Sequence, residues 1–276
     1  MALLLDKRGK EVQITPEVVV TAARNRSSGK EIMALLLENR GNEVQITPEV
    51  VVTTADSMYN GEKIIVLLLE KRRNKIQITP EVVVAAAGNW ESGKDIIALL
   101  LEKRGEEVQI TPEVVAAAAQ LGREDVMALL LEKRGKQVQI TLEVVVAAAG
   151  NEIYGKEIMA LLLENCGKEV QITPEVVVAA IGNRYNGERI IALLLEKRRK
   201  EVQITPEVVV AAVRSGRKDI MALLLEKRGE EVQITPEVVA AAAQLGREDI
   251  IALVRDADRN GDRGGTGDPQ GGRKGG

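Results

Sequence analysis

The sequence has no histidine and no phenylalanine, and it contains one cysteine, one tryptophan and three tyrosines. The lack of histidine removes the side chain that most often acts as general base, proton switch or metal ligand near neutral pH. The lone Cys166 excludes an internal disulfide and a cysteine-based zinc site, and it favours a reducing compartment, which we expect to be the cytoplasm. Because aromatic residues make up 1% of the chain, its core must be aliphatic.

Charge and hydropathy exclude further classes of protein. The formal net charge is −3, which argues against binding to nucleic acid. The N-terminal MALLLDKRG has too short an apolar run for a signal peptide, and no run elsewhere reaches transmembrane length. Carboxylates are plentiful, but they recur with the repeat described next, so no pair stands out as acid and base. We therefore expect a non-catalytic chain without cofactor, metal ion, membrane or nucleic-acid partner.

What the sequence does contain is an internal repeat. The tripeptide Gln-Ile-Thr occurs eight times, and successive copies are 32, 32, 32, 30, 32, 32 and 30 residues apart. Residues 99–125 and 223–249 are identical at all 27 positions. A single compact core needs no such register, whereas a stack of like units does. We predict a repeat domain over residues 1–255 and a disordered glycine-rich tail over 256–276.

Each unit predicts two helices, as the unit around Thr111 illustrates. Thr111 suits a helix N-cap, and Pro112 suits the first helical position, where its missing N–H would be unpaired anyway. Glu113 places an acid at the positive end of the helix dipole, and a run of Val and Ala follows as helix A. A loop that ends near Gly122 leads to helix B, over about residues 124–134.

The ends of the units predict a tight exit and a short linker. Gly135 is expected to follow helix B in a left-handed conformation, and Arg73 and Arg199 at the same position predict less favourable helix ends. The linker residues 12–14 look extended, but packed helices lie ~8–10 Å apart, whereas paired strands need ~4.8 Å. We therefore expect linkers with two aliphatic residues under the helices and the glutamine either outward or capping a helix.

The run TPEVVAAAAQLGREDVMALLLEKRG resembles the ankyrin repeat in its Thr-Pro start, its alanine pair, the glycine before helix B and its Leu-Leu-Leu-Glu run. The resemblance covers most of each unit and implies an all-α solenoid of about eight two-helix repeats of 30–32 residues. Helix A is longer than in ankyrin, and residues 131–141 leave no room for the ankyrin β-hairpin finger. The near-identical tandem units also resemble the repeat arrays of fungal NACHT/NLR-type sensor proteins.

The first unit begins inside a repeat, because Met1 aligns with Met33 in helix B of the next unit. Leu3, Leu4 and Leu5 then lack a preceding neighbour, and no polar capping repeat is visible. Two hypotheses follow. The chain is the terminal piece of a longer array, or it self-associates through its N-terminal repeat.

Residues 88–95, GNWESGKD, have the glycine and lysine spacing of a phosphate-binding P-loop, but Asp95 stands where that motif needs Ser or Thr. The spacing recurs at residues 150–157, where Glu157 takes the last position, and in part at 182–189. A P-loop follows a buried strand, whereas these segments follow an alanine-rich helix. We interpret them as loops that start helix B with an acid. A nucleotide-dependent regulator that uses these glycine-rich loops is the alternative.

All four aromatic residues fall in the loop between helices A and B, which is also the part that differs most between units. Stacking the units places these loops in a row, and Tyr, Trp and Arg are the side chains that most often anchor interfaces. The residues predicted to bind a protein partner of unknown identity are Arg26, Tyr59, Trp90, Tyr154, Arg184 and Tyr185. Two alternatives remain: each ring covers its own loop, or the repeats self-assemble into end-to-end structural polymers.

Overall fold

The computed structural model describes residues 13–246, 250, 252–253 and 256. They form 15 α-helices and two short 3-10 turns, and this part of the chain contains no strand. Seven units have both a helix A and a helix B among the described residues, and the eighth has its helix A, so the predicted all-α solenoid of about eight two-helix units is confirmed. The N-terminal face at residues 1–12 and the predicted tail, apart from Asp256, lie outside the described residues.

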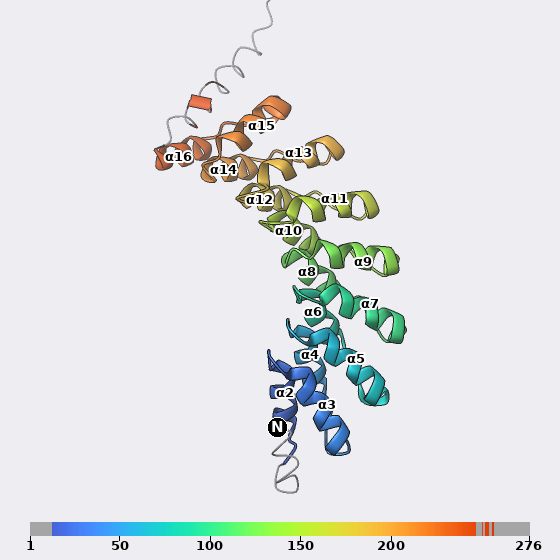
Figure 1. Cartoon of the computed structure of the whole chain (residues 1–276). Helices are drawn as coiled ribbons and strands as arrows, with labels where there is room; N and C mark the ends of the chain where they lie inside the picture. The colour runs from blue at the N-terminus through green and yellow to red at the C-terminus, as the bar shows by residue number, and fades with distance from the viewer. Residues whose placement is uncertain (1–12, 247–249, 251, 254–255, 257–276) are drawn as a thin grey trace, which may run out of the picture.

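The helices alternate along the chain (Figure 1). The A helices are α2 (Pro16–Arg24), α4 (Pro48–Asp56), α6 (Pro80–Gly88), α8 (Pro112–Gln120), α10 (Leu142–Gly150), α12 (Pro174–Gly182), α14 (Pro206–Arg214) and α16 (Pro236–Leu245). The B helices are α3 (Gly29–Arg40), α5 (Gly61–Arg72), α7 (Gly93–Arg104), α9 (Glu124–Arg134), α11 (Gly155–Asn165), α13 (Gly187–Lys197) and α15 (Lys218–Arg228). The 3-10 turns are η1 (Arg73–Lys75) and η2 (Gly229–Glu231).

Helix A begins where threonine and proline predict it. In α8, Thr111 is the N-cap in an extended conformation and Pro112 is the first helical residue. In α4, the Thr47 hydroxyl accepts a hydrogen bond of 3.3 Å from the backbone N–H of Val50, which satisfies a free donor of the first turn. The buried face of α8 consists of Val114, Val115, Ala118 and Ala119. Because half of this face is alanine, neighbouring helices can approach closely.

Helix B carries the larger side chains of the core, and Met127 and Leu130 of α9 are fully buried. Gly135 follows α9 in a right-handed conformation, with φ of −48°, so the predicted left-handed exit is wrong. The chain leaves helix B through a tight right-handed turn that residues other than glycine also adopt. No described residue other than glycine has a positive φ, so Arg73 and Arg199 carry no strain of that kind.

The linkers between units are extended and make no ladder. Val108 and Ile110 are buried beneath the helices, whereas Gln109 between them is exposed, as predicted. Alternation of side chains along an extended segment places the two aliphatic residues on the same side. The linkers therefore add to the core without pairing into a sheet.

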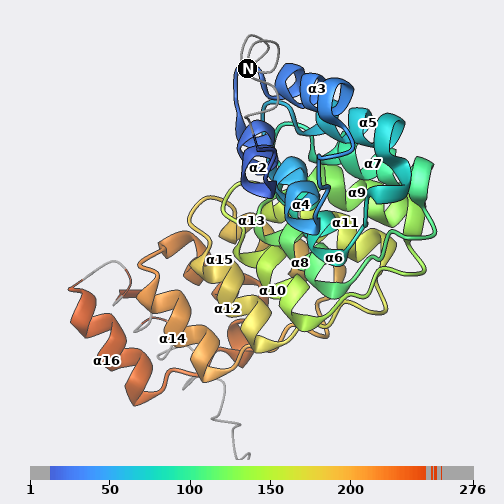
Figure 2. The same cartoon turned by 90° about the horizontal axis from the view of Figure 1, so that it is seen from below.

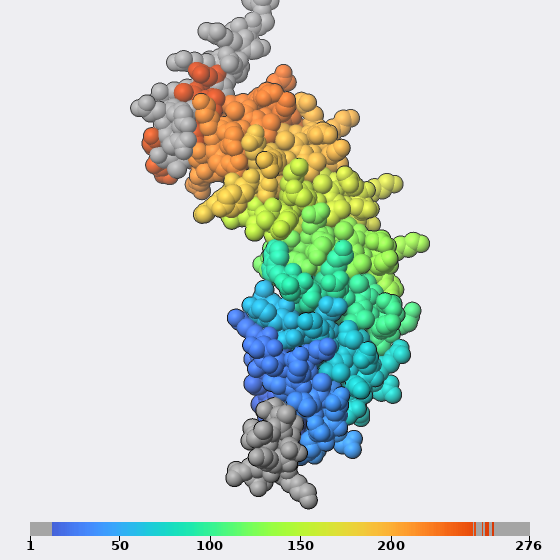
Figure 3. Space-filling view, viewed as in Figure 1, coloured from blue at the N-terminus to red at the C-terminus, as the bar shows by residue number. Residues whose placement is uncertain are grey.

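The units stack so that A helices pack against A helices and B helices against B helices. The array is curved, and the A helices lie on the inside of the curve (Figure 1). Figure 2 shows the same two rows from another direction, and Figure 3 shows the units joined into one continuous body. One aliphatic core runs between the rows through all described units. Stability therefore comes from contacts between neighbouring units.

At five junctions, an arginine at the carboxyl end of helix B joins its unit to the one before. Arg104 Nη1 donates a hydrogen bond of 2.8 Å to the carbonyl oxygen of Arg73, and Arg134 Nη2 donates one of 2.9 Å to that of Gly105. Arg104 also pairs with Glu107, with Nε 2.5 Å from Oε1. The cation lies at the negative end of the preceding helix, where the helix dipole favours it.

Candidate functional site

The loops between helices A and B lie in a row along one edge of the array, which we call the loop edge. It consists of residues 25–28, 57–60, 89–92, 121–123, 151–154, 183–186 and 215–217. Hydrogen bonds and ring contacts join successive loops, so the sequence prediction that the loops form a row is confirmed.

Exposed apolar side chains gather on the loop edge. In the described part of the chain, ten large hydrophobic side chains are exposed, and seven of them belong to this edge. These seven are Met58, Tyr59, Trp90, Leu121, Ile153, Tyr154 and Tyr185. Met58, Leu121 and Ile153 were not among the predicted site residues, although each lies next to or between the aromatic positions. Clusters of exposed apolar side chains on a protein surface are typical of interaction sites.

The rings contact neighbouring loops. The Arg26 guanidinium lies over the Tyr59 ring of the next loop, with Cζ 5.2 Å from the ring centroid. Trp90 lies near two other loops, because Arg123 Cζ is 5.6 Å from its ring and the Tyr154 ring centroid is 6.2 Å away. These distances are those of cation–π and tilted aromatic contacts. The structure thus brings Trp90 and Tyr154 together, and separately Arg26 and Tyr59.

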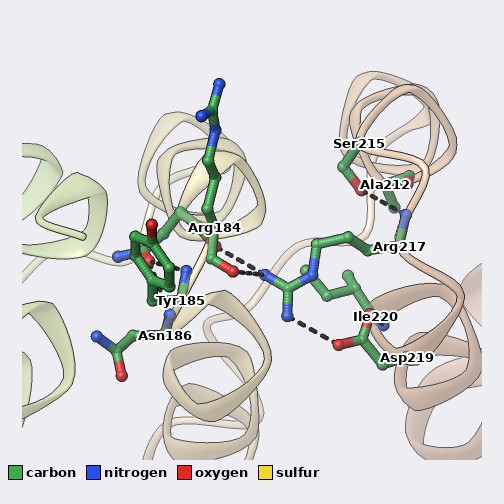
Figure 4. A network of polar contacts seen from close by, with 9 residues as sticks. Arg184, Tyr185, Asn186, Ala212, Ser215, Arg217, Asp219 and Ile220 are labelled. Atoms are coloured by element: carbon green, nitrogen blue, oxygen red, sulfur yellow. Dashed lines mark hydrogen bonds and ion pairs between the residues drawn. The ribbon is translucent and has the colours of Figure 1, made fainter. Parts of the chain in front are cut away.

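Arg184 and Tyr185 lie in the loop between α12 and α13, in the C-terminal half of the loop edge. Tyr185 is 72% exposed, and the Arg184 side chain is 83% exposed. Arg184 Nε lies 3.9 Å from Glu152 Oε1 of the preceding loop, and Figure 4 shows its guanidinium pointing away from the nearby polar network. These two residues are therefore accessible.

Asparagines hold the longer loops in place. Asn89 Oδ1 accepts hydrogen bonds of 3.0 Å from the backbone N–H groups of Glu91 and Ser92. Its Nδ2 donates to the carbonyl oxygens of Ala55, at 2.8 Å, and Ser57, at 3.0 Å, in the preceding unit. One buried side chain thus folds its own loop and fixes it to the previous one. This role was not predicted from the sequence, although Asn is the first residue of four of the five longer loops.

In the shorter loops, an arginine side chain fixes the loop to the preceding one. Arg217 Nη1 donates to the carbonyl oxygens of Asn183, at 2.7 Å, and Arg184, at 3.3 Å, and its Nη2 lies 2.8 Å from Asp219 Oδ2 (Figure 4). Gly216 before it has φ of +68°, which explains why glycine stands there. These loops belong to the units that are two residues shorter than the rest.

Arg123 is the equivalent of Arg217 in the middle of the array. It is 4% exposed, with Nε 3.0 Å from Asp125 Oδ1 and Nη2 2.8 Å from Asp125 Oδ2. Burial opposes ionisation of Asp125, but the hydrogen bonds and charge of Arg123 outweigh it, so the pKa of Asp125 lies below its usual value. The pair fixes the guanidinium that packs against Trp90.

The P-loop-like segments join two helices, because Gly88 ends α6 and Gly93 begins α7. A Cβ on Gly93 would lie 2.2 Å from the carbonyl oxygen of Ala86, and one on Gly155 would lie 2.7 Å from that of Ala148. The second glycine of the spacing is therefore explained by close packing of helix B on helix A. No strand precedes these segments in the described residues, as a phosphate-binding P-loop would require.

Cys166 is partly buried, and burial together with the nearby Glu169 raises the pKa of its thiol. The thiol is therefore less reactive than an ordinary one near neutral pH. Among the described residues, no group of three or more Cys, Asp or Glu side chains could hold a metal ion. No described helix is both long and apolar enough to cross a membrane.

Fold and edge together define a helical repeat array with an elongated, variable surface. Eight stretches match the family described as a domain of unknown function, DUF7104: residues 3–33, 35–64, 67–96, 99–127, 129–159, 161–190, 193–221 and 223–244. The chain therefore belongs to this family, as eight tandem repeats. Comparisons with curated proteins and with solved structures return no match.

Proposed function

We propose that the chain is a non-catalytic scaffold or recognition array that binds a protein partner along the loop edge. The observation that supports this most is the concentration of exposed rings and aliphatic side chains on the loops that differ most between units. Rigid aromatic side chains contribute large contact areas at low entropic cost, and arginines beside them are frequent interface anchors. The repeated helices supply the rigid support.

The test is a variant that removes the four rings together, Y59A/W90A/Y154A/Y185A. The binding assay uses a protein that was captured from the source cells and that also binds the wild-type chain directly when both are purified. The variant is expected to bind it at least tenfold more weakly, with helical circular dichroism unchanged. Equal binding by the variant would contradict the proposal, and loss of helix would show that the rings are structural.

The matched control removes apolar side chains that are exposed elsewhere, in L142A/V239A. This variant is expected to bind the partner as the wild type does. An equal loss in the control would mean that binding does not depend on the loop edge.

We further propose that the repeats are an ankyrin-like form without the hairpin finger, and that they act in the cytoplasm. The Thr-Pro helix start and the paired antiparallel helices support the first proposal, and the lone cysteine supports the second. Self-association through the N-terminal repeat stays a prediction, to be tested by sedimentation at several protein concentrations. Close packing of helix B on helix A accounts for the glycine spacing, so the loops give no support to nucleotide binding.

A further inference from the structure

The inner side of the array forms a second surface, distinct from the loop edge. Each A helix shows solvent a narrow face, which in α6 comprises Glu81, Val84, Ala85 and Gly88. These positions are three or four residues apart and thus lie on one side of the helix. The B helices pack on the other side (Figure 2). We call the surface formed by these faces the A-helix groove.

The A-helix groove holds two hollows at equivalent places four units apart. One hollow, of about 600 Å³, lies between α4, α6 and α8, and the other, of about 730 Å³, lies between α12, α14 and α16. Val84 and Glu81 line the first, and their equivalents Val210 and Glu207 line the second. Both hollows are therefore built from equivalent A-helix positions and not from one irregular loop.

One rim of the A-helix groove is acidic along its whole length. Each A helix has a glutamate as its second residue, and all eight are exposed. They are Glu17, Glu49, Glu81, Glu113, Glu143, Glu175, Glu207 and Glu237. No described ion pair includes any of them.

Little basic charge opposes the glutamates. A hydrogen bond from the Thr235 hydroxyl and another from its own backbone N–H lower the pKa of Glu237. On the opposite rim, seven residues further along each helix, the charged residues are Arg24, Asp56 and Arg214. The A-helix groove thus combines an apolar floor with a row of negative charges at one step per unit.

We infer that the A-helix groove binds an extended cationic peptide segment that carries Lys or Arg at every third residue. Packed helices lie ~8–10 Å apart, so successive glutamates are spaced by about that distance. A polyproline II segment has three residues per turn and rises ~3.1 Å per residue, so every third side chain lies on one side about 9 Å apart. An α-helix rises ~1.5 Å per residue and would need nearly seven residues for the same step.

Such a segment matches both features of the A-helix groove. Its cations meet one glutamate per unit, while small apolar residues between them pack on the Val and Ala floor. Because polyproline II is a major conformer of free chains, little conformational entropy is lost on binding. The interaction is independent of the loop-edge rings.

The test is fluorescence anisotropy with the full chain and a labelled peptide of six Lys-Pro-Val triplets. The comparison peptide has the same composition with its lysines clustered at one end. The triplet peptide is expected to bind at least tenfold more tightly, and added salt should weaken its binding. Equal binding of both peptides, or no binding of either at millimolar concentration, would overturn the inference.

Variants then locate the site. E81Q/E113Q/E143Q/E175Q is expected to lose at least tenfold in affinity for the triplet peptide. The control E102Q/E132Q/E196Q/E226Q removes the same charge from exposed positions on helix B. An equal loss in the control would refute the groove and reduce the effect to overall charge. The ring variant Y59A/W90A/Y154A/Y185A should bind the peptide normally, which separates this inference from the proposed function.

Discussion

Replacing Cys166 by arginine should stabilise the array. Cys166 occupies the position at which other B helices end in an arginine that joins the unit to the one before, as Arg134 does with Gly105. The acceptor for a new arginine is the carbonyl oxygen of Gly135. The acid for it is Glu169, three residues on, as Glu107 is for Arg104. The junction between the fourth and fifth units thus lacks the arginine donor, although its carbonyl acceptor and its acidic partner are both present.

The expected gain is about 1 kcal/mol in the free energy of unfolding. A hydrogen bond from a charged group contributes roughly 1.5–3 kcal/mol, and an exposed ion pair adds about 0.2–1 kcal/mol. Ordering the arginine side chain costs up to ~2 kcal/mol, and the partly buried thiol gives up some of its own packing. The favourable contributions exceed the costs by a small margin, as is usual at a protein surface.

Urea unfolding followed by circular dichroism measures the difference without screening the ion pair. C166K is the control, because lysine supplies the charge without the planar fork that reaches carbonyl and carboxylate together. E169Q in the C166R background should remove part of the gain. A C166R chain no more stable than C166K, or an E169Q change without effect on C166R, would contradict the prediction.

Three further predictions concern the core, the glycines and pH. Leu130→Ala should lower the free energy of unfolding by ~2–5 kcal/mol, measured by urea unfolding, because the side chain is fully buried; a change below 1 kcal/mol would contradict this. Gly93→Ala should lower the free energy of unfolding by about 1–3 kcal/mol, because the new Cβ would clash with a backbone carbonyl oxygen. Gly150→Ala should be neutral or slightly stabilising in the same assay, because no atom lies within 4 Å of its new Cβ. Despite burial, Arg123 lowers the pKa of Asp125, so the stabilisation from this ionised pair is present above the unfolded pKa of about 3.9 and is lost as pH falls through the folded pKa. D125N should therefore flatten the plot of melting temperature against pH below about pH 4. At higher pH, its plot should run parallel to that of the wild type.

Much of the fold could be predicted because each unit repeats the same local signals. Thr111 and Pro112 set the start of helix A, and the aliphatic run of helix B, residues 124–134, ends where the structure ends it. The exit through Gly135 was predicted wrongly, because a glycine after a helix suits both the left-handed cap and a tight right-handed turn. In the structure, backbone N–H groups of Gln137 and Val138 donate to the carbonyl oxygen of Arg134 and close the right-handed turn.

The loop edge was predictable only in part. The positions of the aromatic residues in the loops follow from the repeat register, and the structure places them on a common edge. The partners of Trp90 were not predictable, because Arg123 comes from a shorter loop that brings it back toward the preceding unit. The roles of Asn89 and Arg217 depend on carbonyl groups roughly one repeat away in sequence, which only stacking brings near.

The joints between units have a consequence for how such a chain can change in length. Asn89 and Arg104 both end on main-chain carbonyl oxygens of the preceding unit, and every amino acid supplies that group. These hydrogen bonds do not depend on which side chains the neighbouring unit carries, so one unit can take the place of another. Residues 99–125 and 223–249 are identical and four units apart, so unequal recombination between their coding sequences would insert or delete four whole units. The new junction would form the same bonds as the old one, and the inner groove would lengthen or shorten in step with the array.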